Sequence, residues 1–157
     1  CQPIFAYWLV SPLFIKMLNY KINSKDEMAK FAIDLAKKIE APKILALSGT
    51  LGVGKSFFAK NFINFLQKNP TPVLSPTFNL VYNYQTIKGE IYHFDLYRLK
   101  SEEELENIGF FDAINNHITL IEWPEIAKKY LSKNILSLNI EADKNNEESR
   151  IISINYE

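Results

Sequence analysis

The amino-acid sequence predicts a single α/β domain with three layers (α/β/α), in which helices cover both faces of a mixed and mainly parallel sheet. Two observations carry this prediction. Short apolar runs, typical of strands buried on both faces, alternate along the chain with amphipathic segments of helical period. The second half also contains pairs of β-rich segments joined by turns, and such hairpins add antiparallel strands to a parallel centre.

The first half of the domain is predicted to contain a helix, a strand, a glycine-rich loop and a second helix. Ser24 and Glu27 form a capping box, and apolar residues then recur at helical spacing until a proline ends the run. Residues 43–48 are a short apolar run, which indicates a strand covered on both faces. The second helix is predicted over residues 54–67.

The second half is predicted to supply the remaining strands and two short helices. These segments are two β-rich stretches joined by a turn (77–84 and 90–97), an acidic helix opened by a capping box and ended by Gly109 (101–109), a buried strand (118–122), a short helix that begins with proline (124–131) and a closing hairpin (135–142 and 150–156). No internal repeat or interdomain linker interrupts them, so one domain is expected.

The size and composition of the chain limit its function. With 157 residues, of which 47% are hydrophobic, it can bury a core but is too short for a separate substrate domain. Its 18 basic and 18 acidic residues cancel, so no broad electrostatic footprint for nucleic acid or an anionic membrane is expected; a local basic patch stays open. The only cysteine is Cys1, which excludes an intramolecular disulfide and suits a cytoplasmic location.

Residues 1–16 are an apolar leader that differs from the rest of the chain. The run at 4–15 is shorter than the roughly 20 residues needed to cross a bilayer, contains Pro12 and lacks the basic flank of a signal peptide. We therefore expect it neither to span a membrane nor to direct export, with a membrane anchor as the alternative. Met17 stands just before a well-patterned segment, so we place the domain at residues 17–157.

The loop between the first strand and the second helix carries the strongest chemical signal. Residues 49–56 match the P-loop pattern G-x-x-x-x-G-K-[ST] in its required setting, after a buried strand and at a helix N-terminus. Consecutive N–H groups and the positive helix end converge there on phosphate oxygens. Lys55 is expected to reach the β- and γ-phosphates and the Ser56 hydroxyl to ligate Mg²⁺. A tight connection without a ligand is the alternative.

Two acidic residues at strand ends are candidates to complete this site. Asp95 and Glu122 each follow an apolar strand, and ligands of open α/β sheets gather at the carboxyl ends of strands. A solvated turn or a helix cap is the alternative for each. The predicted nucleotide-binding residues are Gly49, Gly52, Val53, Gly54, Lys55, Ser56 and Phe57.

Three other residues lie near these candidates in the sequence. Thr77 is on the proline-containing segment SPTF, where a nucleotide-sensing switch or a plain turn is possible. Trp123 is either a core residue or an exposed aromatic residue at the mouth of the site. His93 should share the sheet face of Asp95, where packing or a hydrogen bond is more typical of histidine than catalysis.

Five segments, taken together and in order, resemble the TsaE family, formerly called YjeE, of small bacterial P-loop ATPases. They are SGTLGVGKSFFAK, SPTFNLVYNY, YHFDLYRL, EELENIGF and IEWPE, and the resemblance covers about residues 20–156. HFDLYR and IEWPE are not general P-loop patterns, so the combination is highly specific. The resemblance implies a P-loop fold and an enzyme that binds ATP or ADP with Mg²⁺.

The resemblance also implies roles for individual residues. These are phosphate and Mg²⁺ binding by Lys55 and Ser56, a requirement of ATPase function for Asp95, Mg²⁺ ligation by Glu122, functional importance of Trp123, and a switch-like role for Thr77. The sequence departs from the family in two places. Ser56 stands where threonine is common, and it can still ligate Mg²⁺. Phe57 stands where a second small hydroxyl residue is frequent, which leaves only its backbone N–H for phosphate.

The implied role is in tRNA modification. Family members associate with TsaD and TsaB, which transfer threonylcarbamoyl to adenosine 37 of tRNA, and slow ATP hydrolysis is thought to reset that complex. The chain would then meet tRNA only through the complex, consistent with its zero net charge. Two alternatives remain: a small-molecule kinase, which usually needs a lid with arginines, and an interaction module gated by nucleotide with incidental hydrolysis.

Overall fold

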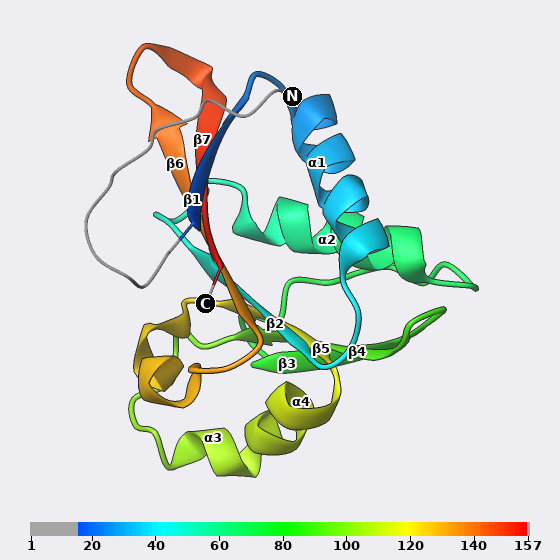
Figure 1. The fold of residues 1–157 in the computed structure, drawn as a ribbon. Helices are drawn as coiled ribbons and strands as arrows, with labels where there is room; N and C mark the ends of the chain where they lie inside the picture. Colours follow the sequence, from blue (N-terminus) through cyan, green and yellow to red (C-terminus); the bar gives the residue numbers. More distant parts are fainter. Residues whose placement is uncertain (1–15, 157) are drawn as a thin grey trace.

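Strand β2 (Lys43–Ser48) stands at the middle of a seven-stranded sheet in the computed structural model, which describes residues 16–156 (Figure 1). The other strands are β1 (Lys16–Ile22), β3 (Val81–Thr86), β4 (Gly89–Asp95), β5 (Ile118–Glu122), β6 (Ile135–Asp143) and β7 (Asn146–Tyr156). The strand order is β1-β7-β6-β2-β5-β4-β3. Neighbours β6, β2, β5 and β4 run parallel, whereas β1, β7 and β3 pair antiparallel at the two sides. The predicted mixed sheet with a parallel centre is confirmed.

Helices cover both faces of the sheet (Figure 1). One layer consists of α1 (Lys25–Lys38) and α2 (Lys55–Leu66), and the other of α3 (Glu104–Asn107), α4 (Phe110–Asn116) and the 3₁₀ helix η1 (Pro124–Tyr130). The capping box of α1 forms with a shift of one residue: the Ser24 hydroxyl accepts from the backbone N–H of Glu27, while the Glu27 carboxylate accepts from that of Asn23. The three layers confirm the predicted α/β/α class.

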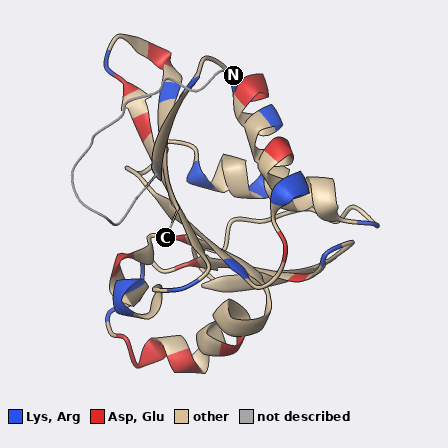
Figure 2. Cartoon of the chain, viewed as in Figure 1, with Lys and Arg blue, Asp and Glu red and all other residues tan. Residues whose placement is uncertain are grey.

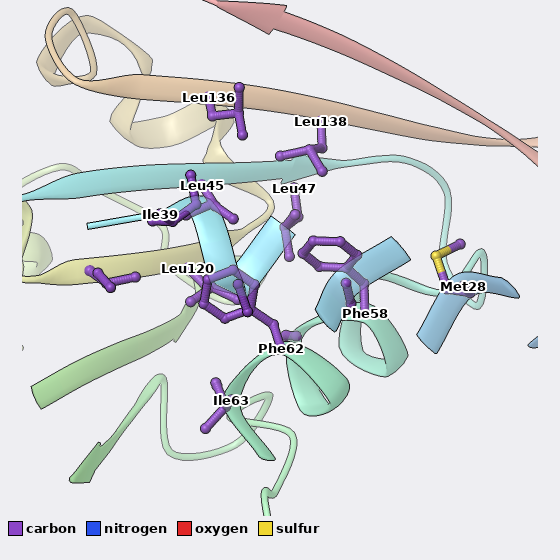
Figure 3. Close-up of a cluster of buried hydrophobic side chains, with 14 of the residues drawn as sticks. Met28, Ile39, Leu45, Leu47, Phe58, Phe62, Ile63, Leu120, Leu136 and Leu138 are labelled. Atoms are coloured by element: carbon purple, nitrogen blue, oxygen red, sulfur yellow. The ribbon is translucent and has the colours of Figure 1, made fainter. Parts of the chain in front are cut away.

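The apolar run of β2 is buried on both of its faces. Leu45 and Leu47 point into the core under α1 and α2, where they meet Phe58 and Phe62 of α2 (Figure 3). Ile44, on the opposite face, joins a second core under α4 and η1. Each fully buried side chain of this size contributes about 1.5–3 kcal/mol of transfer free energy. The central strand is therefore fixed from both sides, and so is the loop that follows it.

The first described strand, β1, was not predicted. It pairs antiparallel with β7 at the edge of the sheet, and among its residues 17–22 only Ile22 is fully buried. A half-exposed edge strand shows little of the continuous apolar run that marked β2. This strand starts at Lys16, the last residue of the predicted apolar leader, and the rest of that leader lies outside the described residues.

Strand β3 begins later than predicted. Residues 76–80 form turns, with the Leu80 N–H donating to the Pro76 carbonyl at 2.7 Å and Leu80 at a positive φ of 66°. The aromatic and β-branched residues of TFNLVYNY suggested a strand from Thr77, but this turn delays pairing with β4 until Val81. Thr77 is consequently on a loop next to the end of β4.

Two of the predicted helices differ in the structure. The acidic helix expected over 101–109 is only four residues long, because residues 101–103 form a bend and turns and the helix starts at Glu104. Its predicted end is confirmed: Gly109 adopts a left-handed conformation (φ 71°), and a further helix, α4, which was not predicted, starts after it. Ser101 does not cap α3; instead the Glu104 carboxylate accepts from the Lys100 N–H. The segment at 124–131 is a 3₁₀ helix, with proline at its first turn as predicted.

Charged residues of both signs occur in both helical layers and in the closing hairpin, and acidic residues are concentrated at α3 (Figure 2).

Among residues 16–156, none of the helices combines the length and the apolar character needed to cross a bilayer.

Candidate functional site

The glycine-rich loop leaves the carboxyl end of β2 and enters α2. Gly49, Gly52 and Gly54 all have positive φ angles, of 139°, 76° and 122°. A Cβ at Gly49 would lie 2.3 Å from the carbonyl oxygen of Ile140 on the neighbouring strand β6, so only glycine fits there. Gly54 then caps α2, and its carbonyl accepts the Phe58 N–H at 2.9 Å. The backbone turn needed to present successive N–H groups is therefore present.

A cavity of about 280 Å³ opens over this loop. It brings together residues from four separate parts of the chain. Its lining comprises Leu51, Gly52, Gly54, Lys55, Ser56, Phe57, Thr77, Asp95, Glu122 and Trp123. Of the predicted site residues, Gly49 and Val53 do not line it. Gly49 packs closely against the backbone of Ile140 on β6, and Val53 is buried against the core and lines a neighbouring cavity.

Lys55 is almost completely buried, with 4% of its surface exposed. Its ammonium group donates to the carbonyl oxygens of Gly49 and Thr50, at 2.6 and 3.0 Å. It also lies 4.0 Å from the centroid of the Trp123 ring, a cation–π contact. Burial lowers the pKa of Lys55, and the negative charges of Glu122 and Asp95 partly oppose that shift. The lysine thus has weak neutral partners that a phosphate could replace.

Glu122 ends β5 and is buried, with 3% of its surface exposed. Its two carboxylate oxygens each lie 3.0 Å from the hydroxyl oxygen of Ser56, which donates to them. Its Oε1 atom is also 2.8 Å from Nε2 of His93. The carboxylate is therefore held from both sides, by the start of α2 and by β4.

Asp95 ends β4 and is paired in register with Glu122 on β5, so both carboxylates project from the same end of the sheet. Its Oδ2 atom accepts the hydroxyl proton of Thr77 at 2.9 Å, and its Oδ1 atom accepts the N–H of Tyr97 at 3.0 Å. The hydroxyl oxygens of Thr77 and Ser75 lie 2.9 Å apart. A chain of hydrogen bonds therefore joins the loop before β3 to the carboxylate of Asp95.

Trp123 is partly exposed at the mouth of the cavity. Its backbone is left-handed (φ 55°), an uncommon conformation for a bulky residue. Besides its contact with Lys55, its ring packs against Tyr97, with centroids 4.8 Å apart. Of the two positions that the sequence left open for Trp123, the structure places it at the site rather than in the core.

The oxygen atoms near the loop fit Mg²⁺. This ion is usually held at phosphate sites by a hydroxyl and one or two carboxylates together with phosphate oxygens and water, and Ser56 and Glu122 offer that pair of hard ligands at 3.0 Å from each other. Within residues 16–156 there is no cluster of three or more His, Cys, Asp or Glu side chains that could hold a metal ion without such a substrate.

A second cavity, of about 540 Å³, lies on the other side of the loop. The start of α1 and the closing hairpin form its walls. Its lining comprises Ile22, Ser24, Lys25, Met28, Gly52, Val53, Gly54, Phe57, Glu148 and Arg150. The guanidinium Nε of Arg150 donates to the carbonyl oxygen of Val53 at 3.0 Å, so the hairpin is tied directly to the loop.

Three residues around the two cavities, Leu51, Arg150 and His93, were not assigned a role in the site from the sequence. Leu51 is 81% exposed at the cavity rim, and no signal beyond its place in the loop marks it. Arg150 is one of only two arginines, but its contact with the loop spans 97 residues of sequence. His93 was placed on the correct sheet face, yet its partner Glu122 depends on the β4–β5 register, which the sequence does not specify.

The fold and this loop define a class: a P-loop nucleotide-binding protein with a mixed sheet. Within that class, the family model described as "Threonylcarbamoyl adenosine biosynthesis protein TsaE" matches residues 22–152. The chain belongs to the TsaE family, which takes part in tRNA threonylcarbamoyladenosine biosynthesis. The resemblance seen in the sequence is thereby confirmed.

Relatives from several bacteria support this membership. The tRNA threonylcarbamoyladenosine biosynthesis protein TsaE of Rickettsia prowazekii is 41% identical over 138 residues, which cover 88% of this chain and 94% of the relative. The protein of the same name from Aquifex aeolicus is 38% identical over 105 residues, or 66% of this chain and 74% of the relative. The crystal structure of Bacillus subtilis YdiB has the same fold, with a TM-score of 0.71 at 23% identity; the match covers 92% of this chain and 88% of YdiB.

Proposed function

We propose that this chain is a Mg²⁺-dependent ATPase that hydrolyses ATP to ADP and phosphate, and that this turnover resets a complex of the TsaD and TsaB proteins during tRNA modification. The observation that carries the proposal is the convergence of Lys55, Ser56, Asp95 and Glu122 on one cavity over the loop. Because the modification acts on tRNA, we expect the protein in the cytoplasm, with tRNA contacted through the complex.

Each residue has a proposed role. The backbone N–H groups of residues 52–57 and the Lys55 ammonium bind the phosphates, and the ammonium exchanges its two carbonyl partners for phosphate oxygens. Ser56 and Glu122 hold Mg²⁺, which when bound neutralises charge on the β- and γ-phosphates. Asp95, fixed by Thr77, orients the attacking water or a water in the outer shell of the metal.

We assign the base and ribose of the nucleotide to the second cavity. The start of the first helix and the closing hairpin form this cavity, and Ser24, Met28 and Arg150 come from those two elements. The cavity shares Gly52, Gly54 and Phe57 with the phosphate site, so a single nucleotide can occupy both. Its apolar wall and peripheral polar groups suit a flat heterocycle with a sugar.

Neither arginine of the chain is placed to assist phosphoryl transfer to a second substrate, as a kinase reaction would require. A small-molecule kinase usually supplies arginines from a lid, and the two arginines of this chain are occupied elsewhere: the Arg98 guanidinium lies 4.3 Å from the centroid of the Phe78 ring, and that of Arg150 donates to three carbonyl oxygens. Hydrolysis therefore agrees better with the geometry than transfer to a second metabolite does.

Phosphate release by the purified protein, alone and with TsaD and TsaB, tests the proposal. We expect Lys55→Ala to lower the rate by about 100-fold or more, because a preorganised positive charge on the phosphates is lost. Glu122→Gln, which removes the carboxylate charge, should lower it while ATP still binds. Lys60→Ala and Glu106→Gln change exposed residues of α2 and α3 and serve as matched controls.

Three outcomes would contradict parts of the proposal. ATP binding without phosphate release in either setting would favour a nucleotide-gated interaction module. Phosphate transferred to an added metabolite would favour a kinase. An unchanged level of the modified adenosine in total tRNA after depletion of the protein would refute the role in tRNA modification.

A further inference from the structure

His93 is a buried polar residue to which the proposed reaction gives no role. It stands on β4 with 1% of its surface exposed, two residues before Asp95 and on the same face of the sheet. Burying an imidazole costs free energy unless its nitrogens find hydrogen-bond partners. The neighbouring residues Ile91, Leu120 and Tyr84 belong to the apolar core, so packing alone would have been satisfied by another apolar side chain.

Its hydrogen bonds are asymmetric. Nε2 lies 2.8 Å from Oε1 of Glu122, whereas Nδ1 is buried without a hydrogen-bond partner in the part of the chain that the structure describes. An ionised carboxylate is only an acceptor, so Nε2 must carry the proton of this hydrogen bond. The Nε2–H tautomer leaves Nδ1 as a buried lone pair, which is less costly than a buried N–H donor without an acceptor.

The Glu122 carboxylate therefore has two different partners. Ser56 donates one hydroxyl proton shared between both oxygens, at 3.0 Å from each, and this side chain is the one expected to turn toward a metal ion. His93 holds Oε1 from within the core and has no such alternative partner. When the Ser56 hydroxyl turns from Glu122 toward a metal ion, His93 is the remaining hydrogen-bond partner of this carboxylate among the described side chains.

We propose that His93 is a positioning residue: its Nε2–H fixes Oε1 of Glu122, so that Oε2 stays directed at the Mg²⁺ position when Ser56 turns to the ion. The proposal rests on the proposed function, because it assumes that Glu122 faces Mg²⁺. Removal of a hydrogen bond that orients a metal ligand typically lowers metal affinity by about 10- to 100-fold.

The test measures how binding of a non-hydrolysable ATP analogue depends on Mg²⁺, by calorimetry in EDTA and at rising Mg²⁺ concentrations. His93→Leu removes the donor. For this variant we expect that the Mg²⁺ concentration that gives half of the Mg²⁺-induced increase in analogue affinity rises about tenfold or more. Its binding of the analogue in EDTA should be unchanged. His93→Gln keeps an N–H donor of similar reach and should stay near the wild type. Thr119→Val removes a buried hydrogen bond on the opposite face and is the matched control for lost stability.

The outcomes separate the two hypotheses. A Leu variant with the Mg²⁺ dependence of the wild type, or a Gln variant as weak as the Leu variant, would overturn the positioning role and leave the proposed ATPase intact. A wild-type protein whose analogue binding does not respond to Mg²⁺ would refute the metal-dependent function and this inference with it.

A measurement on the wild-type chain covers the case in which the Leu variant does not fold. The sequence has only two histidines, His93 and the partly exposed His117, so ¹⁵N spectra of their rings are simple to assign. We expect a protonated Nε2 and an unprotonated Nδ1 for His93. A proton on Nδ1 instead would overturn the inferred hydrogen bond and with it the positioning role.

Discussion

At the scale of single residues, the site contains a cation that is held in place without an anion. The Lys55 ammonium is bound by two neutral carbonyl groups and by the face of Trp123, although three carboxylates, of Glu122, Asp95 and Glu125, lie near enough to influence its pKa. A neutral carbonyl or aromatic partner attracts the ammonium less strongly than a phosphate does, because a phosphate oxygen also carries negative charge. A nucleotide therefore competes for Lys55 with favourable energetics, and Trp123 loses its cation when the nucleotide binds.

This exchange predicts a fluorescence change. In a Trp8→Phe variant, which leaves Trp123 as the only tryptophan, addition of ADP with Mg²⁺ should change the emission intensity, because the ammonium moves off the indole toward the phosphates. Titration in a fluorimeter gives the amplitude and the apparent affinity. With Lys55→Met added, the amplitude should fall sharply. An undiminished signal in that double variant would show that the change does not arise from the lysine.

At the scale of elements, the site depends on contacts between segments far apart in the sequence. The closing hairpin reaches the loop after β2 through Arg150, whose Nε donates to Val53 and whose Nη1 donates to Glu147 and Ser149 of its own strand. The guanidinium is thus fixed at one wall of the second cavity. Strand β7 therefore supports the loop as well as pairing with β1 and β6 in the sheet.

Replacement of this arginine should therefore weaken nucleotide binding. Arg150→Met keeps much of the apolar stem but leaves the Val53 carbonyl without its donor, at a cost of about 1–3 kcal/mol. If about half of that cost falls on the loop conformation that binds nucleotide, ADP affinity measured by calorimetry drops by about two- to tenfold. Lys144→Met, which removes one exposed positive charge from the same hairpin, should leave the affinity unchanged. Equal loss in both variants would point to charge alone.

These elements also mark what the sequence can predict. The buried run of β2 and the glycine spacing after it predict strand, loop and helix, because each follows from local pattern and from backbone freedom at Gly49 and Gly54. The end of the acidic helix at Gly109 also follows from local pattern. The edge strand β1 depends on its pairing with β7, and the start of α3 at Glu104 instead of at the capping-box residue Ser101 is not marked in the sequence. The ring of contacts around Glu122 likewise requires the register of β4 and β5.

At the scale of the whole molecule, the site and the core are built on the same central elements. The loop, α2, β4 and β5 all contribute residues to the cavity, while α2, β4 and β5 also bury Phe58, Phe62, Phe94 and Leu120 on either side of the sheet. Unfolding of the central strands would separate the groups that bind the ligand. Nucleotide binding should therefore be linked to the stability of the whole domain rather than to one loop.

Thermal unfolding measures this linkage. A ligand at 100 times its dissociation constant stabilises the folded state by about 2.7 kcal/mol, and for a domain of this size that raises the midpoint by about 5–11 °C. We expect a rise of this order with ADP and Mg²⁺, followed by calorimetry or by circular dichroism, and a much smaller rise for Lys55→Ala at the same concentrations, whereas Lys60→Ala should respond like the wild type. A midpoint that rises equally in Lys55→Ala would mean that the nucleotide binds away from the loop, because the buried lysine is the one ammonium group that lines the cavity over it.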